Sequence, residues 1–208
     1  MTDKLLAVVR VAFATASVVA LVVLVGELSG RGVFDPVNFF SFFTVQSNLI
    51  GIVVVLGSAF RCFAGVRPSR TWDLVRGASV LYLTVTLIVF ALLLSGADVG
   101  IPIPWVDIVL HKIFPIFLIV DWLLEPPGGR LYLSETLIWL AYPVVWTGYS
   151  LIRGAATGWY PYPFLDPANG GYGTVAGYVA AILVGGVVLI VAIVVVGNLL
   201  SDRRERTA

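Results

Sequence analysis

Charged residues are scarce in this chain, and cysteine and histidine are almost absent. Only 12% of the 208 residues are charged, whereas 59% are hydrophobic. A soluble domain is typically about 25% charged, so this chain lacks the polar surface that a water-exposed protein needs. We therefore expect an integral membrane protein.

The single copies of Cys62 and His111 exclude several kinds of site. One cysteine cannot form a disulfide within the chain or supply a cysteine metal cluster, and one histidine beside it leaves no zinc or haem ligand set. We expect no metal and no other cofactor. The net charge of +1, without a basic patch interleaved with aromatic residues, also argues against a nucleic-acid partner.

Long apolar runs predict an all-α fold, a single domain over residues 1–208 that spans the membrane six times. A bilayer core needs about 20 apolar residues per helix, and the runs lack the alternation of barrel strands. The qualifying stretches are 8–27, 38–60, 76–95, 105–124, 133–152 and 175–199. The first exceeds the length of a signal peptide's apolar core, so we expect it to be retained.

Basic residues predict the orientation of these spans. On one side of the membrane lie Lys4, Arg10, Arg61, Arg67, Arg70, Arg76, Arg130, Arg203, Arg204 and Arg206, and on the other lie Arg31 and Arg153. Basic residues near membrane helices are enriched on the cytoplasmic side. We therefore expect both termini to be cytoplasmic, in a multi-pass protein of the cell membrane.

The last span contains a stripe of small residues, Gly177, Ala181 and Gly185. Such stripes allow the backbones of two membrane helices to approach closely. We interpret this stripe as a packing surface rather than a chemical site.

The segment FFSFFTVQSNL, residues 39–49, places many hydrogen-bonding side chains at the start of the second span. In a continuous helix, Ser41, Thr44, Asn48 and Gly51 fall on one face, with Ser47 beside them. With the N-terminus inside, this span begins at the outer surface. Thr44 then lies roughly 10 Å below that surface, at about 1.5 Å per residue.

His111 is predicted at the same depth in the fourth span. Asp107 precedes it by one helical turn and is placed to accept a hydrogen bond from its ring. Pro115 has no N–H, so the His111 carbonyl should lose its helical partner and the helix should kink there. An ionisable residue at this depth often marks a functional site. Whether Thr44 and His111 are neighbours depends on helix packing.

Structural roles are the alternative for these residues. A threonine in a membrane helix commonly bonds the carbonyl four residues earlier, and a lone histidine can bond across helices without any chemistry. Asp121, near the inner end of the fourth span, is expected to cap the helix or pair with an arginine such as Arg130. An interfacial belt would account for the aromatic residues on the outer side: Trp105, Trp146, Tyr149, Trp159, Tyr160 and Tyr162.

Three segments resemble one protein family in order: FFT at 42–44, HKIFPIFLIVDW at 111–122 and GWYPYPFLD at 158–166. The chain is similar to actinobacterial six-span proteins related to the androgen-induced and androgen-dependent membrane proteins. Animal members of that family are threonine hydrolases that cleave fatty acid esters of hydroxy fatty acids. The resemblance covers nearly the whole chain and implies a nucleophile at Thr44 and a base at His111.

The expected activity is the hydrolysis of a membrane lipid ester. This ester substrate is also the predicted partner of the protein. His111 would take the proton of Thr44, and Asp107 would hold the imidazole. Asn48 is the first candidate donor to the oxyanion and Ser47 the second. The loop at 158–172 is a candidate lid.

A different class of function suits the same residues. Polar groups at one depth, a broken helix and an intramembrane histidine also fit a non-enzymatic protein that binds a lipid or small molecule, such as a sensor or transporter. Ester turnover that depends on Thr44 would separate the two.

Overall fold

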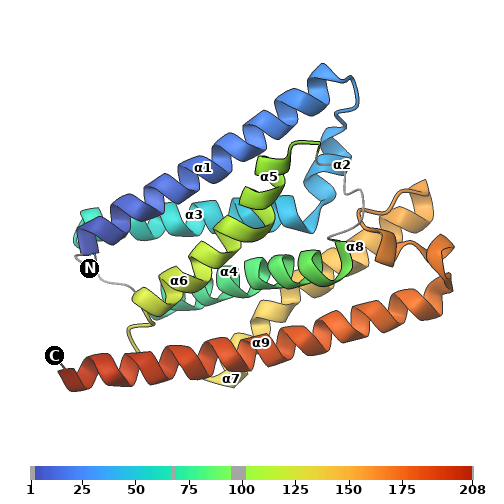
Figure 1. Ribbon diagram of the computed structural model, residues 1–208. Coiled ribbons are helices and arrows are strands. Elements are labelled where there is room, and N and C mark those ends of the chain that lie inside the picture. Colours follow the sequence, from blue (N-terminus) through green and yellow to red (C-terminus); the bar gives the residue numbers. More distant parts are fainter. Residues whose placement is uncertain (1–2, 67–68, 95–101, 208) are drawn as a thin grey trace.

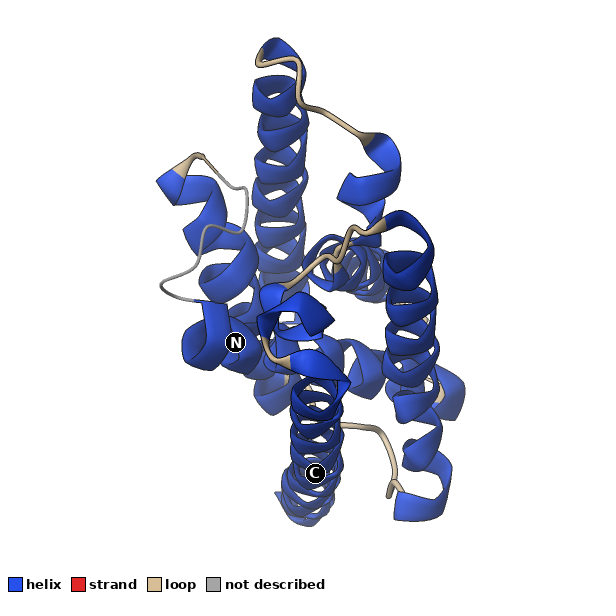
Figure 2. Cartoon of the chain, turned by 90° about the vertical axis from the view of Figure 1, so that its right-hand side faces the viewer, coloured by secondary structure: helices blue, strands red, loops and turns tan. Residues whose placement is uncertain are grey.

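The computed structural model describes residues 3–66, 69–94 and 102–207, and within these it forms helices without any strand (Figure 1, Figure 2). The α-helices are α1 (Asp3–Gly30), α2 (Pro36–Ser41), α3 (Phe43–Phe63), α4 (Arg70–Val89), α5 (Pro104–Ile108), α6 (Phe114–Leu124), α7 (Leu133–Thr136), α8 (Ala141–Thr157) and α9 (Gly171–Thr207). Two π-helical turns are η1 (Phe90–Leu94) and η2 (Val109–Ile113). The 3-10 turns are η3 (Leu137–Leu140), η4 (Pro163–Leu165) and η5 (Pro167–Asn169).

Four helices are long and apolar enough to cross a membrane: Asp3–Gly30, Phe43–Phe63, Arg70–Leu94 and Gly171–Arg204. They correspond to the predicted spans one, two, three and six. The fourth and fifth predicted spans are also helical, but each is built from shorter pieces, α5–η2–α6 and α7–η3–α8. Arg67, used above to assign orientation, lies outside the described residues.

Helix α3 lies inside the bundle, in contact with α1, α4 and α6. On α1 the contact surface is a face of small residues, and Ala7, Ala14, Ser17 and Ala20 are fully buried. Small side chains let the two helix axes approach closely. The small-residue packing face is therefore on the first span.

The stripe predicted as a packing surface on the last span does not serve that role. A Cβ atom added at Gly177 or Gly185 would meet no other atom within 4 Å. Ala181, between them, is exposed. The prediction of a close helix contact at this stripe was wrong for the single chain, because α9 presents the stripe outward.

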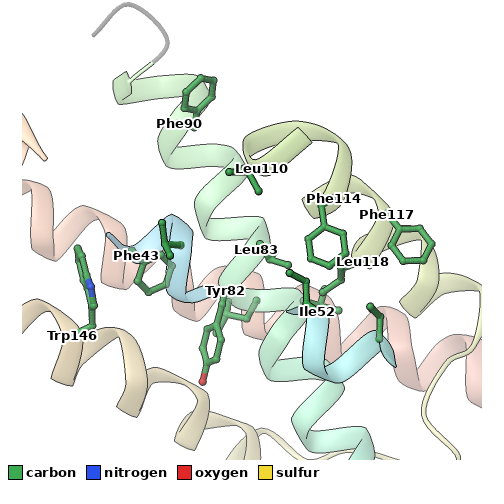
Figure 3. Packing of buried hydrophobic residues seen from close by; sticks show 14 of the residues in the cluster. Phe43, Ile52, Tyr82, Leu83, Phe90, Leu110, Phe114, Phe117, Leu118 and Trp146 are labelled. Carbon is green, nitrogen blue, oxygen red and sulfur yellow. The ribbon is translucent and has the colours of Figure 1, made fainter. Parts of the chain in front are cut away.

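Gly51 brings α3 close to α4 and α6. A Cβ atom at this position would lie 2.6 Å from Leu83 Cδ1 and 3.0 Å from Phe114 Cε1, so only glycine fits without a shift of its neighbours. Figure 3 shows Leu83, Phe114 and Leu118 gathered in this part of the core. Gly51 and Thr44 share a face of α3, so this close packing also brings Thr44 toward the fourth span.

Asp121 pairs with two arginines, neither of which is the predicted Arg130. Its carboxylate accepts hydrogen bonds from Arg10 Nε at 2.6 Å and from Arg76 Nη2 at 3.4 Å. Both arginines also reach Glu125, Arg10 through the carboxylate and Arg76 through the backbone carbonyl. Arg10 comes from α1 and Arg76 from α4, so long-range packing, invisible in the sequence, decides this pairing.

Candidate functional site

Phe42 breaks the second predicted span just before Thr44. Its backbone is extended, with φ −68° and ψ 129°, so α2 ends at Ser41 and α3 begins at Phe43. The continuous helix expected over 38–60 is therefore wrong, and Ser41 belongs to a separate helix from Thr44. Because the first N–H groups of a helix have no partner within it, the break leaves the N–H of Thr44 available.

Thr44 and His111 are in direct contact across two helical segments. Thr44 Oγ1 lies 3.2 Å from His111 Nε2, and both residues are buried. Thr44 lies in the first turn of α3 and His111 in η2. The second and fourth predicted spans are thus neighbours at this depth.

Asp107 holds the other side of the imidazole ring. Its Oδ1 lies 2.8 Å from His111 Nδ1. A carboxylate only accepts hydrogen bonds, so Nδ1 carries the proton and Nε2 of the neutral ring is left to accept the proton of the Thr44 hydroxyl. The Asp107 side chain is 24% exposed, whereas that of His111 is 3% exposed. The series therefore runs from the buried hydroxyl toward the surface.

Tyr162 completes the site, although sequence reasoning assigned it to an interfacial aromatic belt. Its hydroxyl oxygen accepts a hydrogen bond from the Thr44 backbone N–H at 3.1 Å and lies 3.2 Å from Thr44 Oγ1. Tyr162 is only 5% exposed. A signal was present, because Tyr162 lies in the GWYPYPFLD segment, but a tyrosine near a membrane surface is ordinarily an anchor.

The loop that carries Tyr162 is folded back onto the bundle. Gly158 ends α8 with φ +73°, a left-handed conformation that glycine adopts without strain. The ring of Tyr160 then lies against Gly154, where a side chain would collide with it. The ring of Tyr162 stacks on that of Phe164, with 5.3 Å between the ring centroids. These contacts hold its hydroxyl against the start of α3.

Asn48 and Ser47 have other partners than those predicted. The Asn48 side-chain NH₂ donates to the carbonyls of Thr44, at 2.8 Å, and Leu110, at 3.1 Å. Ser47 Oγ lies 3.2 Å from the Thr44 carbonyl and 3.0 Å from Thr86 Oγ1. Both N–H groups of the amide and the single hydroxyl proton are engaged, so neither residue is placed to donate to a reacting oxyanion. Their contacts hold the backbone instead.

The predicted kink in the fourth span takes the form of the π-helical turn η2. The N–H of Phe114 bonds to the carbonyl of Val109, five residues back. Pro115 has no N–H to offer the next carbonyl in this pattern, that of Leu110. Asn48 supplies the missing donor from α3. The proline and the asparagine thus act together to stabilise the turn that carries His111.

A second π-helical turn lies against the first. Phe90, in η1, stacks on the His111 ring with 4.1 Å between centroids and 14° between planes. Single π-helical turns are frequent at functional sites. Here they present a flat apolar surface to one face of the imidazole and exclude water from it.

Thr44 forms part of the wall of a partly open cavity of about 60 Å³, which we call the Thr44 cavity. The other lining side chains are almost all apolar and come from α3, α4, η1, α8, the loop and α9; they include Phe43, Val85, Val89, Trp146, Tyr162 and Leu183. An apolar group fits there, with the hydroxyl as one of few polar contacts.

The arrangement is therefore an alcohol, a neutral imidazole and a carboxylate in hydrogen-bonded series beside an apolar cavity. In such a series the imidazole can take the alcohol proton as the oxygen attacks an electrophile. No protein-family model, curated protein or solved structure matches the chain. Its chemistry is accordingly inferred from the site itself.

Proposed function

We propose that this protein is a membrane hydrolase of lipid esters with Thr44 as nucleophile and His111 as general base. The observation that carries the proposal is the hydrogen-bonded series from Thr44 through His111 to Asp107 at an apolar cavity. The resemblance of the three segments noted above agrees with it. On that resemblance we also place the chain with the androgen-induced and androgen-dependent family.

The first half-reaction forms an acyl-enzyme. Thr44 Oγ1 attacks the carbonyl carbon of the ester while its proton passes to His111 Nε2, and Asp107 stabilises the imidazolium that forms. The tetrahedral intermediate then collapses, the ester C–O bond breaks, and the departing alcohol takes the proton from His111. Water attacks the acyl-threonine in the second half-reaction, with His111 again as base, and releases the carboxylic acid.

The oxyanion of the tetrahedral intermediate needs a hydrogen-bond donor. We assign this role to the Tyr162 hydroxyl, which lies 3.2 Å from the nucleophile. The N–H groups in the first turn of α3, which have no partner within the helix, add positive potential at the same place. The break at Phe42 creates this helix start within the site.

We propose that water reaches the site from the end of the bundle that carries the loop. A second cavity there, of about 180 Å³, is lined by the polar side chains of Asp166, Asn169 and Thr174. It shares Phe164 with the Thr44 cavity. Hydrolysis of an acyl-enzyme in the membrane requires such access.

We further propose a multi-pass protein of the cell membrane with six spans and both termini in the cytoplasm. The start of α1 and the end of α9 lie at the same end of the bundle (Figure 1), as an even number of crossings requires. The charge asymmetry of the sequence assigns this end to the cytoplasm.

The proposal is tested with purified protein, a fluorophosphonate probe and ester substrates. We expect Thr44→Ala to abolish labelling and to lower turnover by at least about 10³-fold, as removal of a nucleophile does. His111→Ala should act similarly, and Thr44→Ser should retain labelling. The matched control is Thr136→Ala, which removes a fully buried threonine whose hydroxyl bonds only its own helix.

Size-exclusion profiles and thermal unfolding check that each variant is folded. If Thr44→Ala hydrolyses the ester as well as Thr136→Ala does, Thr44 is not the nucleophile. If the wild type binds a fluorescent fatty acid but turns over no ester, the site belongs to a non-enzymatic lipid-binding protein.

A further inference from the structure

The Thr44 cavity borders a larger groove between α4–η1 and α9. Val85, Val89 and Ile182 line both spaces. The groove, which we call the α4–α9 groove, has a volume of about 500 Å³. These shared side chains lie between the cavity at Thr44 and the side of the bundle.

The α4–α9 groove is apolar and opens on the outside of the bundle. Its lining side chains are aliphatic apart from Tyr178. On its rim, Leu92 is 76% exposed and Val188 is 62% exposed. In a bilayer these side chains face lipid hydrocarbon, so the groove is open to a molecule that arrives from within the membrane.

We propose that the α4–α9 groove holds the acyl chain of the ester whose carbonyl is attacked by Thr44. This inference rests on the proposed function. The occupant is argued from the three side chains that the groove shares with the Thr44 cavity, and from a lining that offers almost no hydrogen-bonding partner to a headgroup or peptide. From Tyr178 to Leu189 it runs about 16 Å along α9, at about 1.5 Å per residue. That extent accommodates a long, straight chain.

The groove acts by alignment rather than by hydrophobic affinity. A lipid ester already lies in hydrocarbon, so transfer into the groove removes little apolar surface from water. A chain held along α9 instead fixes the position of the carbonyl relative to Thr44 Oγ1, and small misplacements of reacting atoms are costly. The groove should therefore determine chain-length preference in kcat/KM.

Gly185 offers a substitution that fills the groove. It lines the α4–α9 groove, and a Cβ atom there would meet nothing within 4 Å, so the first atom of a larger side chain has space. Gly177 is the matched control, because it also has open space around it and lies on α9, but does not line the groove. Both changes replace a helical glycine by leucine, and so alter helix propensity equally.

The test compares hydrolysis of p-nitrophenyl butyrate and p-nitrophenyl palmitate. For Gly185→Leu we expect kcat/KM for the palmitate ester to fall by about tenfold or more, with the butyrate ester changed less than about twofold. Gly177→Leu should leave both within about twofold. Equal palmitate-to-butyrate ratios in the two variants would overturn the proposal. So would a change of oligomeric state in Gly185→Leu without a change in that ratio, which would assign the groove to a second copy of the chain.

A second readout is independent of catalysis. A photoactivatable palmitic acid should cross-link to peptides of α4 and α9 in the wild type and in Gly177→Leu, but less in Gly185→Leu. If cross-linking follows this pattern while no ester is hydrolysed, the groove binds an acyl chain and the hydrolase assignment fails. If butyrate turnover depends on Thr44 but cross-linking ignores Gly185, the hydrolase assignment stands and the groove proposal fails.

Discussion

The hydroxyl of Thr44 lies between two other side chains, with the imidazole of His111 and the phenol of Tyr162 each 3.2 Å away. Each residue contributes a different capacity. Histidine accepts a proton near neutral pH, whereas the phenol of tyrosine remains a donor at that pH. Asp107 determines which nitrogen of His111 faces Thr44. The direction of proton transfer is thus set by residues from three separate segments of the chain.

Tyr162→Phe tests the role of the phenol at this scale. The variant keeps the ring that packs on Phe164 but removes the oxygen near Thr44. We expect kcat to fall by about 10²–10³-fold with little change in KM, as for the loss of one oxyanion donor. Steady-state kinetics with a soluble short-chain ester measure both constants.

Tyr160→Phe is the control, since it removes a hydroxyl from the same loop but not from the site. A kcat for Tyr162→Phe equal to that of Tyr160→Phe would show that the phenol only anchors the loop.

At the scale of helical elements, the site lies where regular helices are interrupted. Phe42 separates α2 from α3, η1 follows the end of α4, and η2 separates α5 from α6. Non-helical backbone at membrane depth is tolerated where protein covers it and supplies hydrogen bonds. The Asn48 amide does this for Leu110, and the Tyr162 hydroxyl does it for the N–H of Thr44. The breaks at Phe42 and at η2 are therefore each stabilised by a side chain that bonds a backbone group left without a helical partner.

Asn48→Ala should destabilise the protein, because it leaves the carbonyls of Thr44 and Leu110 without this donor. The expected cost is about 1–2 kcal/mol in the free energy of unfolding, seen as a lower midpoint of thermal unfolding in detergent. Pro115→Ala, introduced into Asn48→Ala, restores an N–H five residues after Leu110 and should recover part of the loss.

Kinetics of the same variants separate this role from the earlier expectation for Asn48. A lower kcat with an unchanged unfolding midpoint would indicate an oxyanion donor, contrary to the hydrogen bonds described. Recovery of the midpoint by Pro115→Ala would support the backbone role.

At the scale of the whole molecule, two clusters of buried polar side chains lie at different positions along the bundle. One is the site around Thr44, and the other is the ion network of Arg10, Asp73, Arg76, Asp121 and Glu125 near the opposite end of the bundle. The side chains of Arg10 and Arg76 are 2% and 4% exposed. Buried charges are tolerated only when they are paired and hydrogen-bonded. The network therefore constrains how α1, α4 and α6 pack, far from the site.

Asp121→Asn should destabilise the fold without changing the chemistry. Removal of its charge weakens both hydrogen bonds that Arg10 donates to Asp121, while Asp73 and Glu125 still balance the two arginines, so the expected cost is about 3 kcal/mol. Glu135→Gln is the control, because it weakens a partly exposed pair with Arg70 and should cost less than about 1 kcal/mol. Thermal and denaturant unfolding measure the difference. Folded Asp121→Asn protein should retain kcat, and a large loss of kcat at unchanged stability would contradict a purely structural network.

Much of the architecture follows from composition alone. A chain with 12% charge can hide its backbone from lipid only in helices or in a closed barrel. Its long apolar runs lack the alternation of barrel strands, and the all-helical fold was predicted on that basis. The contact of Thr44 with His111 was suggested by depth but required the packing of α3 against η2. The contact of Tyr162 with Thr44, and the contacts of Asn48 with Leu110 and of Ser47 with Thr86, depend on how distant segments pack, which no single residue specifies.

By itself, the sequence determined the helical class, the apolar segments, the one available imidazole and its carboxylate one turn away, because these depend on residue type and local spacing. Tertiary structure decided which arginines meet Asp121, that Gly177 and Gly185 of α9 face outward, and that a tyrosine from a distant loop reaches Thr44. Those outcomes depend on how helices approach one another, and close approach is set by side-chain shape summed over whole faces, which a linear pattern does not specify.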